Sequence, residues 1–519
     1  MFGRTALLSS LLLSVGFAAV CPQPAPDRPL EFLSWDDLVA LSATARPDEA
    51  LAARLQATLS TPAIHSFDGG AAATPKRPVS PGSGPVLRIA EWNINGGRPY
   101  DQIRDSLAGA SSFGASAKEA AAKRLGVVEA QLRELGQSDV IVLNEVDVGI
   151  PSSGYRDVAL DLARDLGMNM AFGVEFVEVD PLDLGLADPT GTPEQIAEWS
   201  QDYPADPARY RGLTGNAVLS RYPILSARTI RLPRCYDWYA GEMAELAELE
   251  KKRRWTAERV FEERVARQVR HGGRMALVVE LAVPESPTGV LTVVATHLEN
   301  RARPECRQEQ MAYLLTLVRD IKGPVVLAGD FNTSGIDVSP TSFRREFMKR
   351  ATSLKFWLGQ TLWAFAPLGM ARLGTLPLNY MKNFQDPSAF SIPFVMPNGE
   401  NGFFDMTRKF RFTDGGRFDF GGHSGDTRNG NGGPLANSNE RTWKGFAPTY
   451  AFTRTLADVV GFYKLDWFFV KPAVRPGKDY GSFAPHRPMT LNQLNEASGE
   501  RISDHAPIIV DLYLTNEGG

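Results

Sequence analysis

The feature that most constrains the fold is a series of short apolar runs between residues 86 and 515. Each run is rich in Val, Ile and Leu, is bounded by Gly, Pro, Asn or Asp, and has the length of a β-strand. The runs are VLRIAEWNI, DVIVLNEVD, NAVLSRYPI, MALVVELAV, VLTVVATHLE, PVVLAGDFN, LDWFFV and APIIVDLYL. Helical segments, such as residues 116–135 and 307–321, lie between several of them. This alternation predicts sheets covered by helices, in an α/β or α+β body.

Residues 1–20 have the pattern of a secretory signal peptide. Arg4 precedes an uncharged, Leu-rich stretch from Thr5 to Val20, which is too short for a comfortable membrane span. Cys21 follows at the position of the lipid-modified cysteine of a bacterial lipoprotein, although Val20 stands where a small residue is usual. We therefore expect an exported protein that is periplasmic, anchored at the cell surface through Cys21, or secreted.

Residues 21–85 are expected to form a short helical extension and a linker. The sequence from Ser34 to Asp37 has the pattern of a capping box, and residues 47–59 have the composition of a second helix. Residues 69–85 are rich in Gly, Pro, Ala and Ser, which is typical of a linker. The body then spans residues 86–515, with an insertion at about 335–450.

Charge and cysteine content exclude several classes of protein. Lys and Arg number 56 against 60 Asp and Glu, a net charge of −4, so the chain has no basic surplus for binding nucleic acid through its phosphates alone. Six His and three Cys contain no HExxH pattern or clustered ligands for a zinc hydrolase. If Cys21 is cleaved off or lipidated, Cys235 and Cys306 remain as an even pair, and the sequence leaves open whether they are bonded. We expect a monomer.

Polar side chains cluster where the apolar runs stop. They are Asn93, Glu145, His297, Asp330, Asn332, Asp466, Asp504 and His505. Asp330 and Asn332 are two residues apart, so in an extended chain both would point to the same face. An edge that gathers carboxylates, amides and imidazoles needs a compensating cation. Such oxygen ligands favour Mg²⁺, with Mn²⁺ or Ca²⁺ as alternatives, over zinc.

The order of these motifs resembles the endonuclease/exonuclease/phosphatase superfamily, which has a deoxyribonuclease-I-like fold. The motifs are Trp92-Asn93, Asn144-Glu145, Thr296-His297, Gly329-Asp330-Phe331-Asn332, Leu465-Asp466 and Ser503-Asp504-His505. The resemblance covers about residues 86–515 and implies a four-layered α/β sandwich of two packed, mostly antiparallel sheets flanked by helices. It also implies hydrolysis of phosphodiester or phosphomonoester bonds, usually with Mg²⁺.

The resemblance implies a metal site and a site for the attacking water. Glu145 would be the principal metal ligand, helped by Asn93 and Asp504. Asp330 and Asn332 would orient the water and hold a phosphate oxygen. Phosphate-ester hydrolysis builds negative charge on oxygen, which a cation and fixed donors stabilise.

Two imidazoles complete the implied site. His505, oriented by Asp466, would act as general base or as a transition-state donor, and His297 would bind the phosphate or assist the leaving group. The substrate would be DNA or RNA, a phospholipid such as sphingomyelin, or an inositol phosphate. A non-catalytic surface protein that binds through the same scaffold is the alternative, but every motif position expected to carry charge does so.

The insertion departs from the family's pattern. Residues 356–371 read FWLGQTLWAFAPLGMA, without a charge and with four aromatic rings. This segment would either pack on the main body or form an aromatic lip that contacts a membrane surface. A second excursion, residues 241–270, is charged and helical in composition.

Overall fold

The computed structural model describes most of the body and the extension before it. The described ranges are 23–67, 74–110, 122–187, 204–244, 268–333, 386–389, 391–392, 396–397, 399–443, 445–456, 460–474, 482–497 and 501–514. The predicted signal peptide (residues 1–20), Cys21 and the aromatic stretch 356–371 lie outside them. In the described ranges, every helix is too short or too polar to span a membrane.

The larger of two sheets has nine strands in the order β1-β5-β6-β4-β3-β20-β19, with β2 on β3 and β8 on β5. Its strands are β1 (Ala63–His65), β2 (Val79–Ser80), β3 (Gly84–Gly96), β4 (Val140–Val148), β5 (Asn169–Glu178), β6 (Leu213–Ser220), β8 (Arg270–Gly272), β19 (Pro485–Thr490) and β20 (Ile508–Tyr513). The β3–β4 pair is parallel and the others are antiparallel.

The smaller sheet has five strands in the order β18-β11-β10-β9-β7. They are β7 (Ile224–Arg231), β9 (Met275–Ala282), β10 (Val290–His297), β11 (Val325–Asp330) and β18 (Asp466–Lys471). Only β10 and β11 pair in parallel. Three two-stranded ribbons stand apart: β12 (Ser391–Ile392) with β13 (Met396–Pro397), β14 (Arg441–Thr442) with β15 (Gly445–Phe446), and β16 (Tyr450–Leu456) with β17 (Val460–Tyr463).

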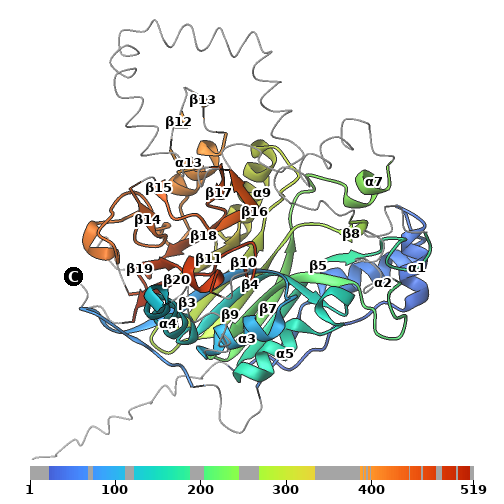
Figure 1. Ribbon diagram of the computed structural model, residues 1–519, viewed down its shortest axis with the longest axis horizontal. Helices are drawn as coiled ribbons and strands as arrows, with labels where there is room; N and C mark the ends of the chain where they lie inside the picture. The colour runs from blue at the N-terminus through green and yellow to red at the C-terminus, as the bar shows by residue number, and fades with distance from the viewer. Residues whose placement is uncertain are drawn as a thin grey trace, which may run out of the picture.

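The helices cover the outer faces of both sheets. They are α1 (Trp35–Ser42), α2 (Glu49–Ser60), α3 (Tyr100–Ala108), α4 (Ala122–Gly136), α5 (Val158–Leu166), α7 (Trp238–Met243), α9 (Pro304–Val318), α13 (Asn401–Lys409) and α14 (Asn492–Asn495), with 3₁₀ turns η2 (Pro151–Ser153) and η3 (Ser424–Asp426). In Figure 1, α3, α4 and α5 cover the larger sheet, and α9 and α13 lie over the smaller one.

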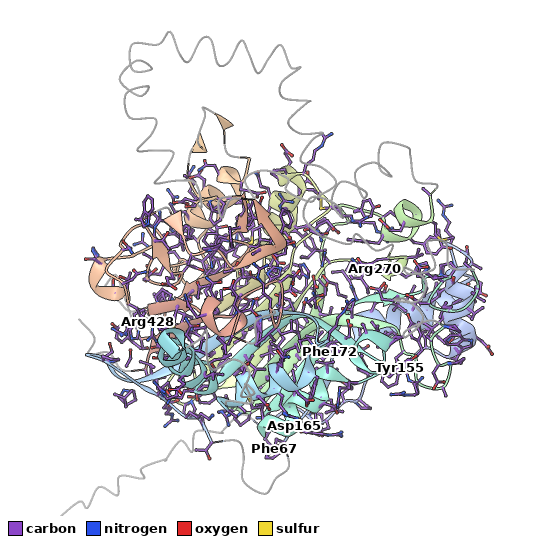
Figure 2. The ribbon with its side chains drawn as sticks, in the orientation of Figure 1. Phe67, Tyr155, Asp165, Phe172, Arg270 and Arg428 are labelled. Carbon is purple, nitrogen blue, oxygen red and sulfur yellow. A yellow bond between two sulfur atoms is a disulfide. The ribbon has the colours of Figure 1, made fainter. Side chains whose placement is uncertain are left out.

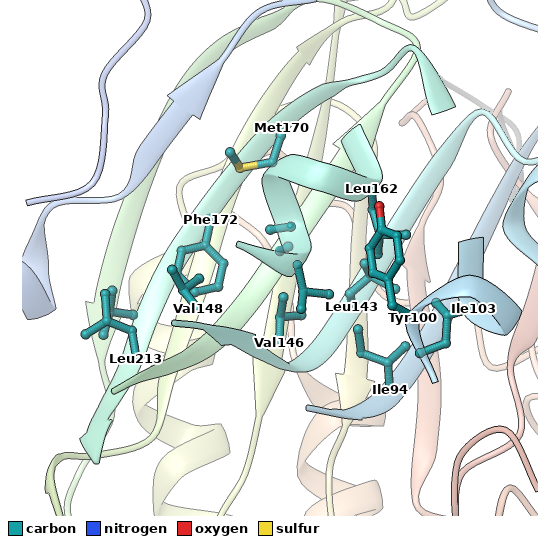
Figure 3. Close-up of a cluster of buried hydrophobic side chains, with 14 of the residues drawn as sticks. Ile94, Tyr100, Ile103, Leu143, Val146, Val148, Leu162, Met170, Phe172 and Leu213 are labelled. Atoms are coloured by element: carbon teal, nitrogen blue, oxygen red, sulfur yellow. The ribbon is translucent and has the colours of Figure 1, made fainter. Parts of the chain in front are cut away.

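Three hydrophobic clusters separate the four layers. One lies between the helices α1–α5 and the larger sheet, and Figure 3 shows part of it, with Ile94, Ile103, Leu143, Val146, Leu162 and Phe172. The second lies between the two sheets, and the third lies between the smaller sheet, α9 and α13. Strand β3 shows how a period of two serves both faces, because Leu87 and Ile89 face the other sheet while Trp92 and Ile94 face the helices. The predicted four-layered sandwich is therefore confirmed.

The apolar run NAVLSRYPI was predicted as one strand, and this was wrong. The chain leaves β6 at Ser220 and enters β7 at Ile224, and the two strands belong to different sheets. Pro223 lacks the N–H that a continuous ladder needs, which explains the break. Similarly, the predicted linker 69–85 is structured at its end, because β2 pairs with the start of β3. Arg270, the end of the predicted helical excursion, lies in β8, and residues 245–267 lie outside the described ranges.

The extension packs onto the body. Ser34 and Asp37 form the predicted capping box at the start of α1. Leu38 and Leu55 belong to the cluster between helices and sheet, and β1 pairs with β5. Residues 23–67 are therefore an integral part of the core.

The described part of the insertion is also docked on the body. In a buried ion pair, Arg307 of α9 donates to Glu400, just before α13. Arg428, labelled in Figure 2, donates to both carboxylate oxygens of Glu134 on α4, at 2.9 and 3.1 Å. Residues 399–443 therefore contact elements of both sheets' helical layers.

Cys235 and Cys306 are bonded, with their Cα atoms 5.9 Å apart. The bond closes a loop with a sequence separation of 71 and ties the segment before α7 to α9. We expect the double variant Cys235→Ser/Cys306→Ser to lose up to about 4 kcal/mol of unfolding free energy, because a loop of this length gains that much entropy in the unfolded chain. Urea unfolding measures this loss. A reductant should bring the wild type down to the variant and leave the variant unchanged, and equal midpoints for all four samples would contradict the prediction.

Candidate functional site

Strand register brings the predicted site residues to one end of the sandwich. In the smaller sheet, His297 pairs with Asp330 and Asp330 pairs with Asp466. In the larger sheet, Asn93 is paired with Asn144, directly before Glu145. Nδ2 of Asn93 donates to Oδ2 of Asp330 at 3.3 Å, so the two sheets are joined at the site.

Glu145 lies at a β-bulge. The pairing of β4 with β6 shifts between Leu143 and Val146, and Glu145 has a φ of 51°. A non-glycine residue in the left-handed region costs conformational energy and is concentrated at functional sites. The bulge turns the Glu145 side chain, 38% exposed, toward His297, whose Nε2 lies 3.9 Å from its Oε1.

Asp330 is held from several sides. Its backbone N–H donates to Oδ1 of Asn144 at 2.8 Å, and its Oδ1 accepts the backbone N–H of Asn332 at 2.8 Å. Gly329, directly before Asp330, allows β11 to lie close to β10, because a Cβ at position 329 would lie 1.8 Å from the carbonyl oxygen of Thr296. Burial is the main cause that raises the pKa of Asp330 to about 7.

Asn332 joins the site differently from the sequence expectation. Strand β11 ends at Asp330, and Asn332 has a φ of 49°, so the chain is not extended between them. Nδ2 of Asn332 donates to the carbonyl oxygen of Leu298 at 3.0 Å. The side chain therefore braces the loop after β11 against the end of β10, and its backbone fixes the Asp330 carboxylate.

His505 and Asp466 form a buried pair. Nδ1 of His505 lies 2.8 and 3.0 Å from the two carboxylate oxygens of Asp466. Burial alone would lower the pKa of His505, but the charges of Asp466 and Asp330 outweigh it and raise the pKa well above its usual value. Nε2 points to the shared space, 3.6 Å from Oδ2 of Asp330. Trp92 fixes the backbone by donating to the carbonyl oxygen of His505 at 2.9 Å.

His297 is held in the opposite protonation state. Its Nδ1 lies 2.8 Å from Nη1 of Arg274, and because a guanidinium only donates, Nδ1 must accept and the proton lies on Nε2. Burial and the charge of Arg274 lower the pKa of His297 well below its usual value. Nε2 has no hydrogen-bond partner among the described residues and lies 3.5 Å from Oδ2 of Asp330. It is a donor aimed into the site.

Sequence reasoning assigned no role to three groups of residues around this site. Arg274 is buried between Glu175 and Glu299, and Glu299 also accepts Nε1–H of Trp238 at 3.0 Å. Asn144 joins strands by donating to Oδ1 of Asn216 at 2.7 Å. Nothing local in the sequence marks Arg274, whose partners come from distant strands.

Glu91 and Lys464 form the third missed group. Both are buried, and neither carboxylate oxygen of Glu91 nor Nζ of Lys464 has a hydrogen-bond partner among the described residues. Burial raises the pKa of Glu91 well above its usual value, and burial lowers that of Lys464 to about 8. Glu91 lies two residues before Asn93 in β3, so the period of two could have placed both side chains on the same face.

The donor set fits a hard divalent cation. Asn93, Glu145, Asp330 and Asp504 offer oxygen atoms, and Asp504 accepts Oγ–H of Ser503 at 3.2 Å beside His505. One oxygen or nitrogen each from Asp330, Asp466 and His505 also lies within 4.8 Å of the others. Because Nδ1 of His505 already occupies Asp466, that trio acts better as a proton-handling group. The predicted ligands Glu145 and Asp504 do not join this group of three among the described residues.

Comparisons with known proteins identify the family of this chain. The model of the endonuclease/exonuclease/phosphatase family matches residues 90–505. No curated protein sequence matches significantly. Among solved structures, an endonuclease/exonuclease/phosphatase from Beutenbergia cavernae is similar, with 17% identity, a TM-score of 0.35 and coverage of 82% of this chain and 71% of that one. An endonuclease/exonuclease/phosphatase family protein from Leptotrichia buccalis has 12% identity and a TM-score of 0.35, with coverage of 82% of this chain and 99% of that one. The human Nocturnin catalytic domain has 13% identity and a TM-score of 0.33, with coverage of 82% of this chain and 94% of that one.

Proposed function

Because the chain belongs to the endonuclease/exonuclease/phosphatase family, we propose that it is an exported, Mg²⁺-dependent hydrolase of phosphate-ester bonds. One observation carries this proposal: two imidazoles with oppositely shifted pKa values flank the buried carboxylate of Asp330. Titratable groups whose environments push their pKa values apart are the mark of acid–base chemistry.

The described side chains supply the steps of an attack by water. Asp330, whose pKa is raised to about 7, is placed to orient the water and accept its proton. His505, stabilised as imidazolium by Asp466, donates from Nε2 to a phosphoryl oxygen, and His297 donates from its own Nε2. These fixed donors stabilise the charge that develops on phosphate. A phosphodiester then gives a phosphomonoester and an alcohol.

Glu145, Asn93 and Asp504 would hold the cation. When bound, Mg²⁺ would polarise a phosphate oxygen and neutralise part of its charge. The buried carboxyl group of Glu91, without a hydrogen-bond partner among the described residues, supports a cation in this region, because Asp466 and Asp330 add negative charge beside it and, after burial, help to raise its pKa. Mn²⁺ or Ca²⁺ would satisfy the same oxygen ligands.

The Cys235–Cys306 disulfide supports export. Disulfides form and persist in oxidising compartments, as outside the cytoplasm of a bacterium. Residues 1–20 provide the signal in this proposal, with Cys21 as the anchoring residue of a lipoprotein.

The proposed activity is tested with bis-p-nitrophenyl phosphate. The chain keeps residues 23–67, since they are part of the core. We expect release of p-nitrophenol with Mg²⁺ or Mn²⁺, its loss in EDTA, and its return when excess Mg²⁺ is restored. Activity that persists in EDTA would remove the metal from the mechanism, and absence of activity with every divalent cation would reject the enzyme.

A further inference from the structure

The hydroxyl group of Thr449 contacts the start of strand β18, where Asp466 holds His505. Its Oγ1 accepts the backbone N–H of Leu465 at 3.0 Å and the backbone N–H of Asp466 at 3.2 Å. A hydroxyl oxygen has two lone pairs, so one side chain serves both donors. Thr449 is 2% exposed, which shields these two bonds from bulk water. The backbone of Asp466 is therefore fixed by a buried side chain as well as by its sheet.

The backbone of Thr449 reaches the other member of the pair. Its carbonyl oxygen accepts the N–H of Ala506, the residue after His505, at 2.7 Å. Its own N–H donates to the carbonyl oxygen of Tyr463 at 2.8 Å, at the end of β17. One residue thus contacts both chain segments whose side chains meet at Nδ1 of His505.

The ribbon β16–β17, which begins at Tyr450, adds contacts around the imidazole. Tyr450 forms a β-bridge with His505, and the centroids of their rings lie 4.9 Å apart. The backbone N–H of Ala451 donates to the carbonyl oxygen of Asp504 at 3.1 Å. The residues on both sides of His505 are therefore hydrogen-bonded to the segment that starts at Thr449.

Sheet pairing alone defines the geometry of the pair weakly. Asp466 is the first residue of β18, the edge strand of the smaller sheet, whereas His505 lies in the segment that leads into β20 of the larger sheet. The contact between them therefore depends on how the two sheets are placed against each other. A misplacement of about 1 Å at a reacting group costs on the order of 100-fold in rate, so this distance needs a direct connection.

We propose that Thr449 is a positioning residue of the His505–Asp466 pair, whose hydroxyl sets where the Asp466 carboxylate lies against Nδ1 and hence where Nε2 points. This inference rests on the proposed phosphoesterase function, in which Nε2 of His505 faces the phosphoryl group. Thr449 acts through Asp466 and not on the substrate, so its loss lowers kcat and leaves KM unchanged.

Replacing Thr449 by valine tests the hydroxyl, because valine has a similar shape but accepts no hydrogen bond. We expect kcat for bis-p-nitrophenyl phosphate with Mg²⁺ to fall on the order of 10- to 100-fold at an unchanged KM. Thr449→Ser keeps the oxygen and should retain the wild-type kcat. Thr58→Val is the matched control, since it removes a buried hydroxyl of α2 that donates to the carbonyl oxygen of Glu31, and it should keep wild-type rates. A wild-type kcat in Thr449→Val, or an equal loss in Thr449→Ser, would overturn the proposal.

Thr449→Ala is the second variant if the valine variant does not fold. It leaves space in which water can accept the two N–H groups, so they keep a partner but lose a fixed one. We again expect a lower kcat at an unchanged KM, with circular dichroism as the measure of folding. A folded alanine variant with the wild-type kcat would reject the positioning role.

A spectroscopic measurement separates this inference from the proposed function. In protein with isotope-labelled histidine, the ring-nitrogen NMR signals of His505 are assigned by their absence in His505→Ala. We expect these signals to shift in Thr449→Val and to coincide with the wild type in Thr449→Ser. If they shift but the wild type hydrolyses no ester, Thr449 positions the pair and the phosphoesterase proposal fails. If the wild type hydrolyses the ester and Thr449→Val changes neither the signals nor kcat, the positioning role fails alone.

Discussion

Replacing His505 by alanine should lower kcat for bis-p-nitrophenyl phosphate by about 10²- to 10⁴-fold, the range that a positioned acid or base contributes. The reason is the position of Nε2, which faces Oδ2 of Asp330 at 3.6 Å while Asp466 holds Nδ1. Alanine removes both the proton and the charge at the place where the phosphoryl oxygens become more negative. Steady-state kinetics at saturating Mg²⁺ measures the loss, and circular dichroism verifies the fold.

Two further variants sharpen this prediction. Asp466→Asn keeps the shape of the pair but no longer supports the imidazolium, so kcat should fall at least about 100-fold. In the double variant His505→Ala/Asp466→Asn the two losses in kcat should not add, because the two side chains act as one unit. His65→Ala, on the edge strand β1, is the matched histidine control and should leave kcat unchanged. Near-normal rates in both site variants would reject the assignment of the pair.

Most of the layered fold could be predicted because buried strands are rich in apolar residues. VLRIAEWNI is apolar on both faces, since β3 packs against helices on one side and against the other sheet on the other. The same rule failed for NAVLSRYPI, where the apolar pattern continues across Pro223 although the chain changes sheets. Apolar content reports burial, but it does not report which layer a residue enters.

The motif residues could be predicted because they lie at or near the ends of buried strands. The supporting residues could not, since their role depends on which strands are neighbours. Arg274 stands before β9, yet its partners lie elsewhere in the chain, Glu175 within β5 and His297 at the end of β10. Glu91 carries a weaker signal, a charge inside an apolar run and in step with Asn93. The buried charge of Glu91 therefore belongs with the motif that it precedes.

Replacing Arg274 by methionine should lower the free energy of unfolding by about 3–5 kcal/mol, the scale for breaking a buried ion pair by removing one partner. Arg274 is 4% exposed, and its partners Glu175 and Glu299 are each 2% exposed. Methionine fills much of the space but removes the cation that the two carboxylates share. Burial already raises the pKa of Glu175 to about 7 with Arg274 present, so the unpaired group has little means to remain charged. Urea unfolding at neutral pH measures the loss.

The charge explanation predicts which second substitution restores stability. In Arg274→Met/Glu175→Gln one unpaired carboxylate is gone, so the double variant should be more stable than Arg274→Met, although Glu175→Gln alone should destabilise the protein. Arg54→Met breaks the exposed pair with Asp37 and should change stability little, because solvent screens such a pair. If Arg274→Met unfolded like Arg54→Met, or if the second substitution brought no recovery, the buried ion pairs of Arg274 would not be what stabilises this end of the sandwich.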